Sequence, residues 1–171
     1  MIAIREKPVR WGIAFSERNY VNGKKKIVRV AEGPEYGMFT AQSQERFFAS
    51  VYEVTTQSDR MGYRLQGQAL ERATNHEMIS EAVTFGTIQV PASGQPIVLM
   101  ADCQTTGGYP RIAQVISADL PILAQARPGD YIQFQKVSWQ EAQRLYVERE
   151  QQMKKWKMII QQKWREMDDA C

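Results

Sequence analysis

The stretch Pro96-Ile97-Val98-Leu99-Met100-Ala101, which runs into Asp102, decides the fold class of this 171-residue chain. An apolar run of this length is too short for a buried helix and is typical of a strand buried on both faces. Just before it, Gly86-Thr87-Ile88-Gln89-Val90 alternates in polarity and stops at Pro91, which cannot donate to a strand ladder. These neighbouring segments predict a β structure.

The rest of the chain from residue 24 repeats this organisation. Short segments rich in β-branched and aromatic residues predict further strands at 26–30, 51–55, 61–65, 112–117 and 131–137. A short helix is expected over 42–50, with Thr40 or Ser43 as its N-cap, and a helical turn over 120–126, which Pro121 can initiate. Many short strands with Gly and Pro turns favour a barrel or sandwich over a doubly wound sheet.

The last part of the chain has a different pattern. Ser138 and Glu141 have the spacing of a capping box, and apolar residues follow at helical intervals for roughly 30 residues. The apolar stripe either packs back along the barrel or pairs with another helix. We therefore expect a mainly β barrel over 24–137, with short helices, and a long C-terminal α-helix over 138–171, preceded by a lead-in segment over 1–23.

Composition argues against several classes of protein. The net charge of +3 is only mildly basic, and the Lys24-Lys25-Lys26 run follows a turn, so we expect no nucleic-acid partner. His76 is the single histidine, and Cys103 and Cys171 are the two cysteines, which disfavours a zinc site, a Ser-His-Asp triad and a disulfide framework. No apolar run approaches the roughly 18 residues of a membrane span. We expect a cytoplasmic protein that requires no metal.

The segment after the apolar strand carries the candidate chemistry. It reads Asp102-Cys103-Gln104-Thr105-Thr106-Gly107-Gly108-Tyr109-Pro110-Arg111, and loops held by a rigid strand are where function is usually found. Thr105 and Thr106 offer hydroxyl groups, and the amides around Gly107 and Gly108 can form an anion-binding concavity. The forked guanidinium groups of Arg60 and Arg111 suit a carboxylate or phosphate. The plainer alternative is a tight turn at Gly107-Gly108 whose backbone Asp102 caps.

The same segments resemble a known family. Ser58 to Gly67, Gly86 to Pro91, and the stretch from Gly94 through Pro110 are similar to the KipA family, also described as the C subunit of 5-oxoprolinase or as allophanate-hydrolase-subunit-2-like. Ala113 to Leu123 and the turn Arg127-Pro128-Gly129-Asp130 continue the similarity, which extends from about Trp11 to Ala142. Cys103 stands where the family pattern is variable, so we assign it no catalytic role, although its thiol can react if the rim is open.

The resemblance implies a fold and a reaction. Family members are roughly twice this long, and their two halves are cyclophilin-like β-barrels, of which this chain would be the second. With the KipI-like B subunit of 5-oxoprolinase and its A subunit, they convert 5-oxoproline to glutamate at the expense of ATP. ATP is then a cofactor of the complex, because the chain has neither a P-loop nor a G-x-G-x-x-G helix start. A face left open by the absent half also allows a homo-oligomer.

For this reaction we expect four roles among the candidate residues. Asp102 would be a base or proton relay. Arg60 and Arg111 would clamp the substrate carboxylate or a phosphate. Tyr63 and Tyr109 would form pocket walls. A developing oxyanion would receive hydrogen bonds from Gln89, Gln104, Thr105 and Thr106.

Two other functions fit the same resemblance. One is a regulatory module that binds KipI, the inhibitor of a sporulation sensor histidine kinase. The other is a biotin-dependent carboxyltransferase, since fused homologues form that domain of urea carboxylase. Fold alone does not choose among the three.

Overall fold

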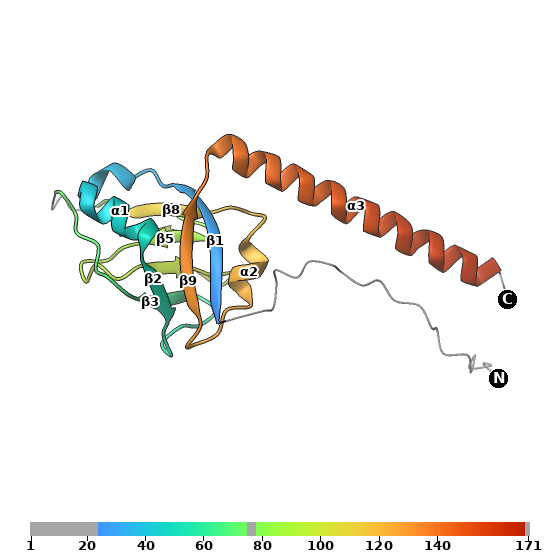
Figure 1. Cartoon of the computed structure of the whole chain (residues 1–171), viewed down its shortest axis with the longest axis horizontal. Coiled ribbons are helices and arrows are strands. Elements are labelled where there is room, and N and C mark those ends of the chain that lie inside the picture. Colours follow the sequence, from blue (N-terminus) through green and yellow to red (C-terminus); the bar gives the residue numbers. More distant parts are fainter. Residues whose placement is uncertain (1–23, 75–77, 170–171) are drawn as a thin grey trace.

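The computed structural model describes residues 24–74 and 78–169, with side chains to Glu166. Within these ranges seven strands close into a barrel in the order β1-β8-β5-β6-β3-β2-β9 (Figure 1). β1 closes the barrel, because it pairs in parallel with β9 and antiparallel with β8. The strands are β1 (Lys25–Glu32), β2 (Val51–Val54), β3 (Gly62–Gln66), β5 (Thr87–Gln89), β6 (Ile97–Leu99), β8 (Arg111–Val115) and β9 (Tyr131–Lys136).

The expected mainly β architecture is confirmed. Alternation places Val28 and Val30 of β1 in the core, each fully buried, and Ile132 and Phe134 of the paired strand β9 beside them. The stacked rings of Phe47 and Phe134, with centroids 4.8 Å apart, join the helix α1 (Ala41–Ala49) to this core. Burial of such apolar side chains is the main stabilising contribution to a small barrel.

The local helix signals are also confirmed. Thr40 is the N-cap of α1, and its hydroxyl accepts a hydrogen bond from the Ser43 amide at 3.2 Å. The 3-10 helix η1 (Tyr36–Met38) precedes it, and α2 (Leu120–Ala124) has Pro121 in its first turn. His76 and the segment 1–23 lie outside the described residues.

Two features of the sheet differ from expectation. β6 is buried on one face only: Val98 is fully enclosed, whereas Ile97 and Leu99 are half-buried on the outer face. In addition, β4 (Glu81–Ala82) pairs with β7 (Thr106–Gly107) in a short antiparallel ladder outside the barrel. The outer face of β6 is apolar because it lines a pocket that this ladder helps to enclose.

The long helix α3 (Trp139–Asp169) begins as predicted, with the Ser138 hydroxyl accepting from the Glu141 amide at 3.1 Å. It then projects away from the barrel as a rod (Figure 1). Its last hydrogen bond to the barrel that the structure shows runs from Arg149 to the Ser117 carbonyl oxygen. The stripe therefore does not pack back along the barrel, and Met153 stays about half exposed, at 48%. Whether α3 pairs with another helix stays a prediction.

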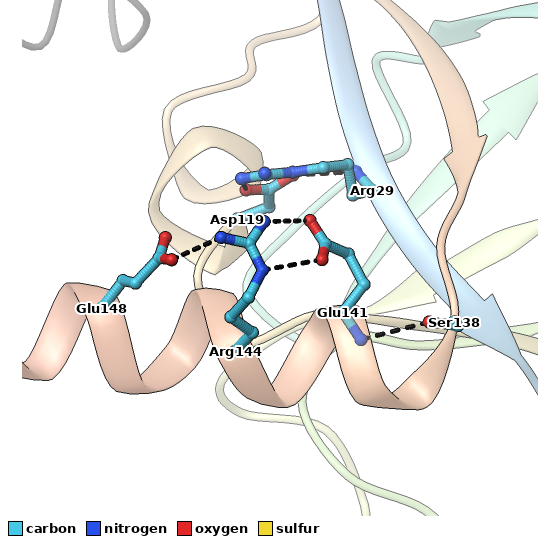
Figure 2. A network of polar contacts seen from close by, with 6 residues as sticks. All are labelled: Arg29, Asp119, Ser138, Glu141, Arg144 and Glu148. Atoms are coloured by element: carbon cyan, nitrogen blue, oxygen red, sulfur yellow. Dashed lines mark hydrogen bonds and ion pairs between the residues drawn. The ribbon is translucent and has the colours of Figure 1, made fainter.

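Charged residues cluster where the start of α3 lies beside the barrel (Figure 2). The carboxylate of Asp119 is 1% exposed and accepts three hydrogen bonds from Arg29: from its backbone amide at 2.8 Å, from Nε at 2.9 Å and from a terminal nitrogen at 2.5 Å. On α3, Arg144 bonds to Glu141 and Glu148. Hydrogen bonds from Arg144, aided by its charge and that of Arg29, lower the pKa of Glu141.

Among the described residues, no helix is long and apolar enough to cross a membrane.

Candidate functional site

A pocket of about 490 Å³ lies on the outer face of the barrel. Its floor is the outward side of three adjacent strands, β3, β6 and β5, through Gly62, Arg64, Leu99, Ile97 and Gln89. Its walls come from the neighbouring loops, through Asp59, Met61, Val83, Cys103, Gln104, Thr106, Gly107, Gly108 and Tyr109. The segment that was singled out in the sequence thus forms one side of a cavity large enough for a small metabolite.

The strand register aligns three side chains across this floor. Arg64 of β3 lies opposite Ile97 of β6, and Ile97 lies opposite Gln89 of β5. The neighbouring row points into the barrel, where Val98 and Ile88 are fully buried. Since successive side chains on a strand alternate in direction, Arg64, Ile97 and Gln89 all face outward.

Gln89 is a polar side chain held in place almost completely buried, at 5% exposure. Its Nε2 donates to the carbonyl oxygen of Tyr109 at 3.1 Å, and this acceptor fixes which end of the amide lies there. In the described part of the chain no donor bonds to Oε1, and that atom is not among the enclosed polar atoms without a partner. Gln89 therefore presents a carbonyl oxygen to the pocket.

The two arginines expected to clamp the substrate have other partners. Arg111 donates to both carboxylate oxygens of Glu35, at 2.7 and 2.6 Å, and to the Ala82 carbonyl oxygen at 2.8 Å. Hydrogen bonds from Arg111 lower the pKa of Glu35 despite its burial, so both groups stay charged. Arg111 thereby ties β8 to η1 and β4 and does not line the pocket. Arg60 is 85% exposed and pairs with Asp102 at 2.9 Å, also outside the pocket.

Arg64 is the arginine that the sequence analysis missed. It is exposed and lines the pocket, and in residues 24–74 and 78–166 no hydrogen bond or ion pair engages its guanidinium group. Its backbone, by contrast, is fixed by bonds to the Ser58 hydroxyl. The alternation within residues 62–66 was the signal that could have found it, because Arg64 and Leu65 must point to opposite sides of β3.

The other predicted residues divide into two groups. Those that the structure brings to the pocket are Gln89, Gln104, Thr106, Gly107, Gly108 and Tyr109. Those that it places elsewhere are Arg60, Arg111, Asp102, Thr105 and Tyr63. Tyr63 shares the inward row of β3, and its hydroxyl donates to the Ala126 carbonyl oxygen at 3.1 Å, so it is not a pocket wall. Cys103, to which we assigned no role, does line the pocket.

Gly107 is required beside Gln89. A Cβ at this position would lie 2.4 Å from Nε2 of Gln89, whereas a Cβ at Gly108 would meet nothing closer than the Ser80 hydroxyl oxygen at 3.7 Å. We expect Gly107→Ala to displace the Gln89 amide and weaken ligand binding about tenfold or more, while the barrel stays folded because a side-chain end can move. Calorimetric titration of 5-oxoproline, the expected substrate, into Gly107→Ala and the control Gly37→Ala tests this, because a Cβ at Gly37 would meet nothing within 4 Å and Gly37 is outside the pocket. Equal binding by the two variants would show that Gln89 is not positioned by Gly107.

Comparisons with known proteins place this barrel in a family. Residues 4–136 match the family model for the carboxyltransferase domain, subdomain A and B. The chain belongs to this carboxyltransferase-domain family. It is 48% identical to the C subunit of 5-oxoprolinase from Haemophilus influenzae, over 80% of this chain and 44% of that protein. It is 52% identical to the C subunit of 5-oxoprolinase from Escherichia coli, over 67% of this chain and 37% of that protein.

A solved structure supports the same family assignment. The Kluyveromyces lactis urea amidolyase superposes on 72% of this carboxyltransferase-domain chain with a TM-score of 0.68 and 26% identity, through 8% of its own length. The resemblance to the C subunit of 5-oxoprolinase that the sequence motifs indicated is thus confirmed. The chain spans less than half of the length of the two bacterial relatives.

Proposed function

We propose that this chain is part of the C subunit of an ATP-dependent 5-oxoprolinase, which opens the lactam of 5-oxoproline to give glutamate. The observation that carries the proposal is the position of the pocket. Apart from Val83, its lining comes from the segments 58–67, 86–91 and 94–110, within a chain that is 48% identical to the C subunit of a known 5-oxoprolinase. The A subunit and the KipI-like B subunit of such a complex are the proposed partners.

The reaction requires activation, because an unstrained lactam resists attack by water. In the proposed step ATP phosphorylates the lactam oxygen, water adds to the carbonyl carbon, and the C–N bond breaks as the nitrogen gains a proton. ADP leaves after the phosphoryl transfer, cleavage of the C–N bond gives γ-glutamyl phosphate, and a second water hydrolyses this acyl phosphate to glutamate and phosphate. ATP would bind elsewhere in the complex, and the groups around this pocket would hold the lactam and its developing negative charge.

The pocket residues are suited to holding the lactam and stabilising its developing negative charge. Gln104 and Thr106 lie on one wall beside Gly107 and Gly108, where side-chain donors and backbone amides can meet an oxyanion. Asp102 remains a candidate proton relay only at the rim, because its side chain is 47% exposed and paired with Arg60. A base that is this open to water must be covered by a partner before it can act efficiently.

A carboxyltransferase is the second candidate function, and it has an observation of its own. The family model is a carboxyltransferase domain, and the superposing structure is a urea amidolyase. In this alternative the pocket would accept a carboxyl group from a carrier encoded on another chain.

The experiment that tests the proposal measures ATP hydrolysis that depends on 5-oxoproline. The full-length form of this protein is mixed with its A and B partner subunits, and each of the three is omitted in turn. Loss of coupled hydrolysis when this protein is omitted supports the proposal. Hydrolysis that persists without it, together with tight binding to the KipI-like partner, would replace the proposal with the regulatory module that counters KipI.

A further inference from the structure

The pocket offers a small ligand one positive charge and one neutral acceptor at defined places. Arg64 is the one cation among the described residues that line it, and its guanidinium group has no protein partner there. Asp59 is the one acid of this lining. Its Oδ1 already accepts from the amides of Met61 and Gly62, at 2.8 and 3.1 Å, so it serves the turn before β3.

We infer that Arg64 binds the carboxylate of the substrate while Oε1 of Gln89 accepts the hydrogen bond of its ring N–H. The inference rests on the proposed function for the identity of the substrate. It assigns the carboxylate to an arginine that differs from the two indicated by the sequence motifs. The pocket thereby selects small carboxylates that carry an N–H group on the neighbouring carbon.

The spacing of the strands fits this assignment. Arg64 and Gln89 are separated by one intervening strand, so their Cα atoms are roughly 10 Å apart, at about 4.8 Å for each step between strands. The pocket above this row, at about 490 Å³, has room for a ring of five atoms. Ile97 lies between them and provides an apolar surface for the methylene groups of that ring.

The orientation follows from the ligand's own geometry. In 5-oxoproline the ring nitrogen is flanked by the carbon that bears the carboxylate and by the lactam carbonyl. With the carboxylate toward Arg64 and the N–H toward Gln89, the carbonyl lies on the side of Gln89 away from Arg64. Gly107 lies against the Gln89 amide, and its neighbour Thr106 also lines the pocket, so donors there can stabilise the oxyanion.

Arg64 and Gln89 discriminate between ligands because an incorrect ligand leaves the guanidinium group or the amide oxygen without a hydrogen-bond partner. An acceptor that a ligand covers without offering a donor is costly, so an analogue without the N–H binds much more weakly. A forked guanidinium gains two parallel bonds from a carboxylate that a neutral carboxamide cannot supply. Both differences can be measured without removing any residue.

The test uses the complete complex and four arginine variants, Arg60→Ala among them, with coupled ATP hydrolysis as the readout. We expect Arg64→Ala to raise the KM for 5-oxoproline about 100-fold with a smaller change in kcat, and Arg64→Lys to restore part of it. Arg127→Ala is the matched control, since Arg127 is exposed on the turn before β9, away from the pocket. With 5-oxoprolinamide, which lacks the carboxylate, wild type and Arg64→Ala should behave alike. With N-methyl-5-oxoproline, wild type should lose about 100-fold in kcat/KM.

The outcomes separate this inference from the proposed function. An unchanged KM in Arg64→Ala, or a rise in Arg60→Ala instead, overturns the inference while the proposed function stands. If wild type shows no turnover of 5-oxoproline, the proposed function fails. Calorimetric titration of 5-oxoproline (the acid) and 5-oxoprolinamide (the amide) into this protein then tests the inference by itself. Tighter binding of the acid that depends on Arg64 supports it, and equal binding of both ligands overturns it.

Discussion

Replacing Asp119 by Asn should lower the free energy of unfolding by about 4 kcal/mol, a large part of the stability of a domain of this size. Asp119 is 1% exposed and receives three hydrogen bonds from Arg29, which is itself partly buried (Figure 2). The variant loses the negative charge but keeps the polar group, so the Arg29 guanidinium keeps its place without the charge of Asp119. Breaking one side of such a buried pair costs more than the pair contributes to stability.

Urea unfolding of the chain, followed by circular dichroism, measures this loss. Asp102→Asn is the matched control: the substitution is the same and the partner is again an arginine, but the side chains are 47% and 85% exposed. We expect the control to cost less than about 1 kcal/mol. Similar losses in the two variants would contradict the stabilising role of the buried Asp119–Arg29 pair, which joins α2 to β1.

Replacing Glu35 by Gln should cost about 3 kcal/mol at pH 7 and progressively less in acid. The Glu35 and Arg111 side chains are only 12% and 16% exposed, and hydrogen bonds from Arg111 lower the pKa of Glu35. A carboxyl whose pKa is lower in the folded state stabilises the fold above its unfolded pKa. This stabilisation is lost as the pH falls through the lowered value.

The difference in unfolding free energy between wild type and Glu35→Gln should therefore be complete well above the ordinary glutamate pKa of 4.5 and shrink as the pH falls through that value toward the lowered pKa of the folded state. Thermal unfolding of both proteins from pH 3 to pH 8 provides the curve. A difference that is constant over this range would show that Glu35 contributes through packing and not through its charge.

Most of the barrel could be predicted because its strands carry local signals. Val28, Val30, Ile132 and Phe134 lie where the alternation of apolar and polar residues places them. The caps at Thr40 and Ser138 were equally visible, since a capping hydroxyl acts on an amide three residues ahead. Such signals depend on a few neighbouring residues and are independent of the closure of the barrel.

The arginine partners could not be predicted in this way. Arg111 pairs with Glu35, which is 76 residues away in the sequence, and the Arg60–Asp102 pair spans 42 residues. Only the strand register brings these groups together and leaves Arg64 in the pocket without a partner among the described side chains. The partly covered outer face of β6 could not be predicted either. The ladder of β4 and β7 that helps to cover it has only two residues in each strand, which is too short for a recognisable sequence pattern.

Alkylation of Cys103, a free thiol in the lining of the pocket, tests the proposal that 5-oxoproline binds there. The complete complex is treated with N-ethylmaleimide without ATP, with and without saturating 5-oxoproline, and labelling is followed by peptide mass spectrometry. Labelling of Cys171, the other cysteine of the chain, is the internal control for the activity of the reagent. We predict that 5-oxoproline slows alkylation of Cys103 several-fold and leaves Cys171 unchanged, because the bound ring covers the thiol. An active complex in which Cys103 reacts equally fast with and without 5-oxoproline would contradict the claim.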